Sequence, residues 1–448
     1  MDAVLLGRIQ FAFTALYHYL FVPLSVGFGL VLAILLTKAY KTKDPKDEAL
    51  ASFWLRLFIG TFAVGVATGI TMEFSFGTNW ADYSRFVGDI FGAPLAAEAL
   101  FAFFMESVFL GVLAFGKNKI GPKAYVASGW LVWAGSCLSC LWIIIANSWM
   151  QTPAGFEVVD GRAVLTDFFA AAINFSTGQR YLHVIVALLL TGALAAVAIA
   201  AYYQLKGRAP EMSKKLMKIG SVVAVVCAVF MMVAAHQQAC EVAEQQPAKL
   251  AAMEGQWEDG PAEMSLFGWV DEESGTTYTI GIPGLTSFVA SGSFDTSYTG
   301  LNSLGENEYT GNINAIYQCY HFMLYMYGAV IIVVLLGLFV TFGKLKNKWA
   351  LRFMVLGPLF AILAIEFGWM VAELGRQPWI VYGQMLTSDA YSLAVEPWML
   401  IVTIILFVAV YALIYFLWLR SAFRTIKKGP EVFLETETLA EEEEVDEL

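Results

Sequence analysis

Residues 397–419 read PWMLIVTIILFVAVYALIYFLWL and contain no charged side chain. A helix needs about 20 apolar residues to cross the hydrocarbon core of a bilayer, and this run is long enough. The ten-residue alternating segments of a membrane β-barrel are absent, and eight more long apolar runs occur along the chain. The sequence therefore predicts an all-α membrane bundle of about nine helices. The expected spans are 9–36, 54–77, 95–116, 125–148, 182–204, 217–235, 313–342, 350–374 and 397–419.

The composition agrees with a membrane protein. Of the 448 residues, 58% are hydrophobic and 15% are charged. Soluble domains carry about 25% charged residues, so a water-soluble enzyme is excluded. Much of the net charge of −11 comes from residues 431–448, which hold nine acids and no base. We expect residues 421–448 to form an acidic cytoplasmic tail without stable structure, and the chain lacks the basic patch that binding to nucleic acid would require.

Lysine and arginine residues predict the orientation of the bundle. Of the 27 basic residues, 21 lie next to alternate connections, in the stretches 38–56, 117–123, 206–218, 344–352 and 420–428. These stretches fall on one side of the membrane, and basic residues concentrate on the cytoplasmic side. The N-terminus is therefore expected outside and the C-terminus in the cytoplasm.

The segment 236–312 is the longest stretch between two spans and is expected on the outer side. It contains twelve acidic residues and one basic residue, Lys249. Its Gly-, Ser- and Thr-rich part, 274–304, predicts an irregular loop, whereas 247–257 has a helical pattern. Long loops in compact bundles are often functional. A binding role for Lys249 is one interpretation, and a solvated surface lysine is the alternative.

Polar residues within the spans are the candidate functional groups. Histidine in hydrocarbon is costly unless it is bonded or ligates a metal, and membrane haems are commonly held by His and Met. His18, His183, Met323 and Glu373 all fall in the outer half of the predicted bilayer. They favour haem ligation, with hydrogen bonding to a neighbouring helix as the alternative for any one histidine.

Buried carboxyl groups are the second signal. Glu98 and Glu106 are eight residues apart, which in a regular α-helix is ~12 Å along the axis and about 80° around it. Glu73, Glu366 and Glu373 also lie in spans. Because an ionised carboxylate in hydrocarbon is expensive, a hydrated proton relay is the functional interpretation and neutral helix–helix hydrogen bonding the alternative.

The end of the eighth span carries a further group of candidates. Trp369 and Glu373 are four residues apart and therefore share a helix face. Gly375 and Pro378 end the helix and place Arg376 at the outer interface. There its guanidinium could bind a propionate or a quinol oxygen.

The cysteines provide little evidence of function, and motifs for nucleotide binding are absent. Cys137 and Cys140 form a C-x-x-C pattern inside a span. The favoured interpretation is that both are small residues of the helix core. Cys240 and Cys319 both lie near the outer face, where a disulfide is allowed but not required. The sequence contains no Walker motif, dinucleotide-binding glycine pattern or zinc-ligand cluster.

Five blocks of sequence match one known family. The chain resembles subunit I of cytochrome bd-type quinol oxidases over nearly its whole length, and the compact outer loop is similar to the short-loop branch. The blocks begin with RIQFAFTALYHYLFVPLSVG and GVATGITMEFSFGTNWADYSRFVGDIFGAPLAAEALFAFFMES. They continue with ANSWMQTP, KLAAMEG and GWMVAELGRQPW.

The resemblance implies three haems. His18 and Glu373 match the axial ligands of two high-spin haems, b595 and haem d (or a third haem b), with the assignment between them left open. His183 matches one ligand of the low-spin haem b558. Met323 matches the other, with Met326 as the alternative.

One departure from the family pattern and five further matching residues accompany this ligand set. His321 stands where the family usually has an arginine, so it could also ligate iron or bind a propionate. Glu98 matches a carboxylate beside the oxygen-reducing haem, Glu106 a position in the proton route, and Trp369 a position between haems. Lys249 and Glu254 match the quinol-binding pair.

The implied function is a terminal respiratory oxidase. Quinol (ubiquinol or menaquinol) would be oxidised at the outer face and O2 reduced to water, with proton motive force generated without pumping. Residues 1–235 and 313–420 would form the helical parts, and 236–312 the quinol-binding loop. The family acts in the bacterial cytoplasmic membrane with a second membrane subunit, subunit II, and often a small single-helix subunit.

Two other functions also fit intramembrane Glu and His residues. A secondary transporter would be expected to show inverted repeats and broken midplane helices, which are not evident here. A haem-containing quinol dehydrogenase that passes electrons to a partner would need only the low-spin haem.

Overall fold

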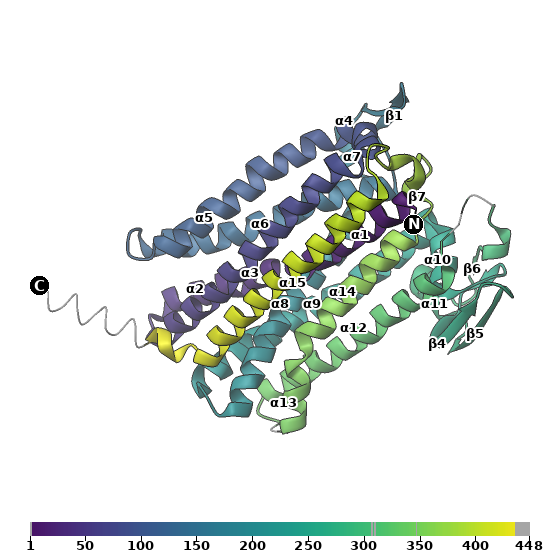
Figure 1. Cartoon of the computed structure of the whole chain (residues 1–448). Coiled ribbons are helices and arrows are strands. Elements are labelled where there is room, and N and C mark those ends of the chain that lie inside the picture. Colours follow the sequence, from purple (N-terminus) through teal and green to yellow (C-terminus); the bar gives the residue numbers. More distant parts are fainter. Residues whose placement is uncertain (1, 306–307, 309–310, 346, 435–448) are drawn as a thin grey trace, which may run out of the picture.

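The computed structural model describes residues 2–305, 308, 311–345 and 347–434. Residues 435–448 of the predicted acidic tail lie outside the described part. Residues 421–428, which were expected to lack stable structure, instead form the last turns of the helix that begins at Pro397. The described helices run roughly parallel in one bundle, and small hairpins and short helices gather at the end where the N-terminus lies (Figure 1).

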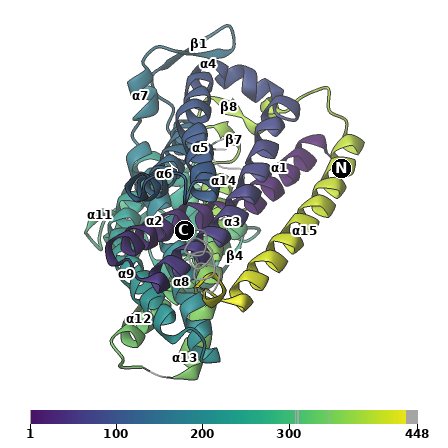
Figure 2. The ribbon, with the colours of Figure 1, turned by 90° about the vertical axis from the view of Figure 1, so that its left-hand side faces the viewer.

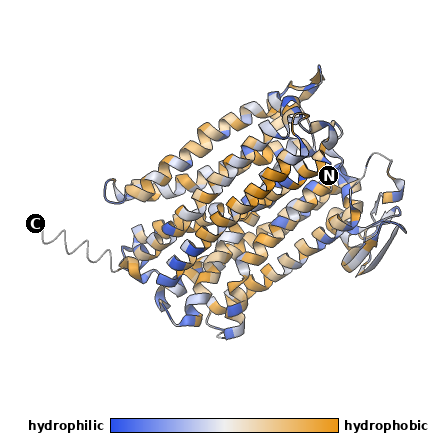
Figure 3. Ribbon diagram, viewed as in Figure 1, coloured by the Kyte–Doolittle hydropathy of each residue, from blue (hydrophilic) through white to orange (hydrophobic). Residues whose placement is uncertain are grey.

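The described residues contain nine helical segments long and apolar enough to span a membrane, which confirms the predicted helical class and number. Figure 3 shows apolar residues along these segments and hydrophilic ones toward their ends. The helices extend several residues past most predicted spans, because the polar turns at their ends are helical as well. In order they are α1 and α2 (Ala3–Tyr19, Val22–Thr42), α3 (Pro45–Thr78), α4, η1 and α5 (Ala81–Ala97, Glu98–Phe103, Phe104–Phe115), α6 (Pro122–Gln151), α8 (Thr177–Lys206), α9 (Pro210–Gln245), α12 (Ile313–Thr341), α13 and α14 (Lys348–Val355, Gly357–Leu374) and α15 (Pro397–Lys428).

Two spans are interrupted beside candidate site residues. The first breaks between Tyr19 and Val22, where Pro23 lacks the amide hydrogen that would bond to the carbonyl of Tyr19. This break places His18 in the last turn of α1. The third span passes through the π-helical segment η1, which begins at Glu98. The angle of about 80° expected between Glu98 and Glu106 assumed a regular α-helix and does not apply across η1.

The main apolar core lies where α2, α3, α8 and α9 meet. The backbones of α2 and α8 approach closely at Gly27 and Gly192, where a Cβ on either residue would overlap the other helix. At the edge of the bundle, α15 packs beside α1 and α3 (Figure 2). Only a small part of α15 is buried by the described chain.

The basic stretches gather at the bundle end opposite the N-terminus. The connections α2–α3, α5–α6 and α8–α9 lie there, together with the last turns of α15 (Figure 1). Arg208 in the α8–α9 connection donates hydrogen bonds to the backbone carbonyls of Lys427 (Nη1 to O) and of Lys428 (2.9 Å, Nη2 to O). The structure thus separates one basic end from one end rich in loops and hairpins.

The prediction of an irregular loop over 274–304 is wrong. Residues 264–282 form a two-stranded antiparallel hairpin, and a short helix follows. The β-branched residues of TTYTIGI (276–282) favour strand, although Gly and Thr enrichment suggested a loop. The predicted helix at 247–257 is α10 (Pro247–Glu254), and it ends at Gly255, whose φ of 62° suits glycine.

The remaining elements at this end are short. They are β1 (Phe156–Val159), β2 (Arg162–Leu165), α7 (Phe168–Ala172), β3 (Gly260–Pro261), β4 (Met264–Asp271), β5 (Thr276–Ile282), α11 (Leu285–Ser291), β6 (Ser297–Tyr298), η2 (Leu301–Ser303), β7 (Trp379–Val381), β8 (Met385–Leu386) and η3 (Thr387–Ala390). The strands form four separate antiparallel pairs, β1–β2, β3–β6, β4–β5 and β7–β8.

Candidate functional site

His18 is oriented by a threonine of the neighbouring helix. Its Nδ1 lies 2.8 Å from Thr68 Oγ1, and that hydroxyl in turn donates to a backbone carbonyl of its own helix, α3. Thr68 therefore accepts a hydrogen bond from Nδ1–H, which makes Nε2 the nitrogen with the free lone pair. Gly69 lies beside the ring, where a Cβ would be 3.3 Å from Cε1 and 3.8 Å from Nε2. The arrangement suits an axial ligand whose ring is oriented by the hydrogen bond from its other nitrogen to Thr68.

Glu373 is held from two helices near the end of α14. Asn147 of α6 donates from Nδ2 to Oε1 at 2.9 Å, and Arg376 forms an ion pair with Oε2. The Glu373 side chain is nevertheless 38% exposed, so the described protein atoms do not enclose it fully. One turn earlier, the Trp369 ring meets Tyr19 edge-on with a centroid distance of 5.0 Å. Trp369 thus joins the helix of Glu373 to the residue next to His18.

The other two predicted ligands lie on helices that both pack against α14. His183 of α8 has a buried Nδ1 without a hydrogen-bond partner among the described residues. Met323 of α12 faces α14 at Gly368, where a Cβ would lie 3.2 Å from the Met323 sulfur. Glycine at this position leaves room beside the thioether.

His321 contacts the outer loop. Its Nδ1 lies 2.7 Å from the Tyr317 carbonyl oxygen, so Nδ1 donates, and Nε2 lies 3.9 Å from Glu254 Oε2. The imidazole is 1% exposed. Nε2 forms no hydrogen bond within the described residues, so His321, like His183, keeps a buried ring nitrogen available for a ligand.

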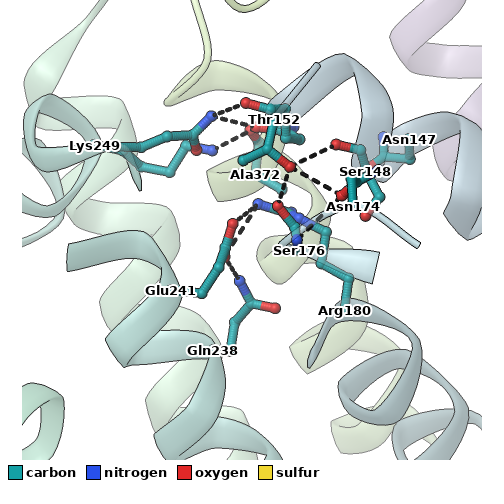
Figure 4. A network of polar contacts seen from close by, with 12 residues as sticks. Asn147, Ser148, Thr152, Asn174, Ser176, Arg180, Gln238, Glu241, Lys249 and Ala372 are labelled. Carbon is teal, nitrogen blue, oxygen red and sulfur yellow. Dashed lines mark hydrogen bonds and ion pairs between the residues drawn. The ribbon is translucent and has the colours of Figure 1, made fainter. Parts of the chain in front are cut away.

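Lys249 is buried rather than solvated. It is 2% exposed, and its Nζ donates to Gln151 Oε1 at 2.9 Å (Figure 4). Within the described ranges, no carboxylate forms an ion pair with it. Burial holds the pKa of Lys249 well below its usual range, with Arg180 contributing in the same direction. A buried lysine with only an amide partner is costly, which favours a functional role over the surface alternative.

Glu254 has separate partners on another side of α10. Thr286 donates to its Oε1 at 2.6 Å, and the Ser265 amide donates to Oε2 at 3.4 Å. Burial raises the pKa of Glu254 to about 7. The structure therefore does not pair Lys249 with Glu254, although both belong to one short helix.

The sequence and fold of known proteins match this chain closely. The model of the family described as "Cytochrome bd terminal oxidase subunit I" matches residues 6–430. The chain belongs to this family. It is similar to cytochrome bd ubiquinol oxidase subunit 1 of Bacillus subtilis, with 39% identity covering 96% of this chain and 95% of that one. It is 34% identical to cytochrome bd-II ubiquinol oxidase subunit 1 of Escherichia coli, covering 92% and 94%.

A solved structure confirms the fold. The bd oxidase from Geobacillus thermodenitrificans superposes with a TM-score of 0.88 at 28% identity, covering 96% of this chain and 99% of that chain. Membership of the cytochrome bd family confirms the predicted terminal oxidase and its quinol:O2 oxidoreductase class, and it decides against the transporter and dehydrogenase alternatives.

The family implies haems, and the donor atoms of this bd subunit fit them. Imidazole and thioether groups are common haem ligands, and His18, His183 and Met323 supply them. Buried groups without partners among the described residues include Nε and Nη1 of Arg376 as well as Nδ1 of His183. An arginine with unpaired buried nitrogens suits an anionic propionate.

The predicted relay acids lie in different settings. Ser139 of α6 donates to Glu98 at 2.8 Å, and Glu106 is buried against α6, where a Cβ on Gly135 would meet its Cγ. Both oxygens of Glu366 are buried without a partner in the described chain, whereas Glu73 is exposed. The structure thus brings Glu98 and Glu106 to one neighbouring helix, while the Glu73 side chain is exposed in the described chain.

The polar network at the C-terminal end of α6 was not predicted from the sequence. Gln151 is buried, and its Oε1 accepts from both Lys249 and Gln246. Figure 4 shows Arg180 and Glu241 pointing toward one another in the same network, and their atoms lie 3.3 Å apart. The block ANSWMQTP contains the relevant pattern, because Asn147 and Gln151 are one turn apart and can share a helix face. The sequence alone assigned neither residue a function.

The cysteines form no disulfide. All five are free. Cys240 donates to the Ala290 carbonyl at 3.0 Å, and the Cys319 sulfur lies 3.9 Å from that of Met370. A bond between Cys240 and Cys319, which the sequence left open, is therefore not formed.

Proposed function

We propose that this bd subunit oxidises quinol beside α10 and delivers the electrons to three haems held within the bundle. The observation that carries the proposal is the outer end of α6. There Asn147 binds the proposed haem ligand Glu373, and Gln151 binds the proposed quinol-site residue Lys249. One rigid helix face thus holds both sites at a fixed separation.

The haem ligands proposed are those named from the sequence. His183 and Met323 would hold the low-spin haem b558, while His18 and Glu373 would each hold a high-spin haem, b595 or haem d (or a third haem b). When bound, the haems supply electron transfer and the reduction of O2 to water. The hydrogen bond from His18 to Thr68 supports a fixed ring orientation, and Gly368 supports room at Met323.

Quinol would bind between the loop and the bundle. The Lys249 ammonium or amine can hydrogen-bond a quinol oxygen, since its burial leaves it with a single amide partner. Glu254, whose pKa of about 7 is close to physiological pH, can accept a quinol proton in its ionised form. His321 lies beside this carboxyl, with Nε2 3.9 Å from Glu254 Oε2. Arg376 would bind a haem propionate or the quinol.

Proton uptake for O2 reduction would use a part of the bundle away from the proposed quinol site. Glu106 and Glu98 lie along the helix formed by α4, η1 and α5, and both contact α6. With the basic end in the cytoplasm, as the positive-inside rule favours, these groups would take up protons from there. Release from Glu254 on the outer side and uptake on the inner side build proton motive force without a pump. Each charge moved against 100 mV stores about 2.3 kcal/mol.

The assembly proposed follows the family. A second membrane subunit, subunit II, and a small single-helix subunit would complete the oxidase in a bacterial cytoplasmic membrane. The relatives from Bacillus subtilis and Escherichia coli are named as ubiquinol oxidase subunits. Ubiquinol and menaquinol are therefore the substrates to test. We place the chain in the short-loop branch because 236–312 is compact.

The variant Lys249→Ala tests the quinol assignment. Quinol-driven O2 consumption by the purified oxidase should show a KM raised about tenfold or more, as expected for the loss of a charged hydrogen bond. The haem absorption spectrum should stay unchanged. An unchanged KM would contradict the binding role, and loss of haem would show that Lys249 supports a haem instead.

A further inference from the structure

The hairpin formed by β4 and β5 lies lengthwise on a membrane-spanning helix. Contacts between β4 and α12 run from Asn314 to Tyr325, eleven residues or ~16 Å along the helix axis. Three hydrogen bonds join them: Val270 N to Asn314 Oδ1 (3.2 Å), Gln318 Nε2 to Gly268 O (2.9 Å), and Tyr325 Oη to Leu266 O. The hairpin therefore follows α12 inward from its first turn rather than standing away from the bundle.

One face of the hairpin is packed against the bundle. Val270 is buried beside Tyr317 of α12, and Thr277 donates to the Gly255 carbonyl at 2.6 Å. Gly268 permits this approach, because a Cβ there would overlap the Tyr317 hydroxyl. Contacts within the chain therefore hold this face against the bundle, although Thr279 on it stays exposed.

The opposite face is apolar and uncovered. The strand register sets Phe267 opposite Ile280 and Trp269 opposite Tyr278, so these side chains share a face, which Ile282 extends. We call these five residues the apolar hairpin face. Their exposed fractions range from 43% to 72%. A row of large apolar side chains is unusual on a surface in contact only with water.

The acidic residues at one end of the hairpin lie in and beside its turn. The turn carries Asp271, Glu272 and Glu273, and Glu272 accepts a hydrogen bond from the Asn314 amide at 3.0 Å. The acidic turn therefore lies at the first turn of α12, at the outermost point. The apolar hairpin face begins next to it and continues toward the middle of the bundle.

The apolar hairpin face is continuous with the surface of α12. The rings of Phe267 and Tyr325 lie 5.6 Å apart. Phe322 of α12 is exposed nearby, and Ile332, Leu335 and Phe339 are exposed farther along the same helix. Figure 1 shows β4 and β5 beside the end of α12 at the edge of the bundle.

We propose that the apolar hairpin face rests in the interfacial layer of the membrane, with lipid as its partner. Trp and Tyr are enriched at this depth because their rings are apolar and their edges polar. Attachment to a spanning helix places the face at this depth, and the acidic turn stays in water. This inference does not depend on the quinol assignment.

Spin labels on the two parts of the hairpin test the proposal. The oxidase with its companion subunit is placed in nanodiscs of phosphatidylethanolamine and phosphatidylglycerol. A nitroxide is attached at Ile280→Cys on the face or at Glu273→Cys in the turn, which is the matched control. Unsubstituted protein labelled in parallel corrects for the five native cysteines. Power saturation then compares accessibility to O2, which concentrates in lipid, with accessibility to a water-soluble nickel chelate.

The expected result is that O2 reaches position 280 more readily than the chelate does, with the reverse at position 273. Greater access of the chelate at position 280 would overturn the proposal, because the face would lie in water. Low access of both reagents would also overturn it, because a second protein or copy would then cover the face. Tyr278→Cys reads the same face if Ile280→Cys fails to fold, and an unchanged haem spectrum verifies folding.

Discussion

Asn147 and Gln151 lie one turn apart on α6 and bind residues of two different proposed sites. Asn147 donates to the Glu373 carboxylate, and Gln151 accepts from the Lys249 side chain, each at 2.9 Å. Residues at i and i+4 share a helix face, so a single rigid surface orients both groups. The two variants below separate their effects.

Gln151→Leu and Asn147→Leu should have complementary effects. Loss of the Gln151 amide leaves Lys249 without its hydrogen bond, so the KM for quinol should rise by about tenfold with the haem spectrum unchanged. Loss of the Asn147 amide frees one oxygen of Glu373, so the high-spin haem spectrum should shift with KM unchanged. Steady-state O2 consumption and absorption spectra measure the two effects. Equal effects of both variants on both readouts would show general disruption of α6 instead.

The pH dependence of quinol oxidation should report on Glu254. Burial raises the pKa of this carboxyl to about 7, against an opposing influence of Thr286. Below that pH the group is protonated and cannot accept a quinol proton, so kcat/KM should fall as pH drops through 7. Glu254→Gln should lower kcat/KM about 100-fold and remove this acid limb. If the fall of kcat/KM at low pH persists in Glu254→Gln, another group causes it. A wild-type profile that is flat around pH 7 would contradict the proton-acceptor role of Glu254.

The buried ion pair between Arg180 and Glu241 should matter for stability. The two side chains are 8% and 0% exposed, and Gln238 also donates to Glu241. Glu241→Ala would leave a buried guanidinium without its partner, which costs about 3–5 kcal/mol. Thermal unfolding of the purified oxidase should show a clearly lower melting temperature.

The exposed pair between Lys46 and Glu211 provides the control for that experiment. Exposed pairs contribute little, so Glu211→Ala should leave the melting temperature almost unchanged. Equal shifts for the two variants would mean that burial of Arg180 and Glu241 does not decide their contribution.

The sequence predicted the helical bundle well because span length and apolar content are read directly from residues such as 397–419. It also singled out His18 and His183, since polar groups in hydrocarbon are rare and costly. Met323 was a candidate only because it lies in the same predicted layer as His183 and matches a family ligand. The ends of the helices were less predictable. Polar turns such as the start of α9 continue a helix past the bilayer without an apolar signal.

The loop and the networks could not be derived from local pattern. The hairpin of β4 and β5 depends on Gly268 fitting against Tyr317, a contact between distant parts of the chain. The lysine and glutamate of KLAAMEG were both predicted to bind quinol, but their protein partners, Gln151 and Thr286, could not be read from the sequence. Which neighbours a short helix meets is decided by tertiary packing.

The low-spin haem assignment is the central claim, and the absorption spectrum of His183→Ala tests it most directly. The reduced-minus-oxidised spectrum of the purified oxidase should lose the low-spin b-type signal and keep the high-spin haem signals. Met323→Leu should weaken the same signal, whereas Met326→Leu, the matched control three residues later, should leave it intact. A full low-spin signal in His183→Ala would contradict the account.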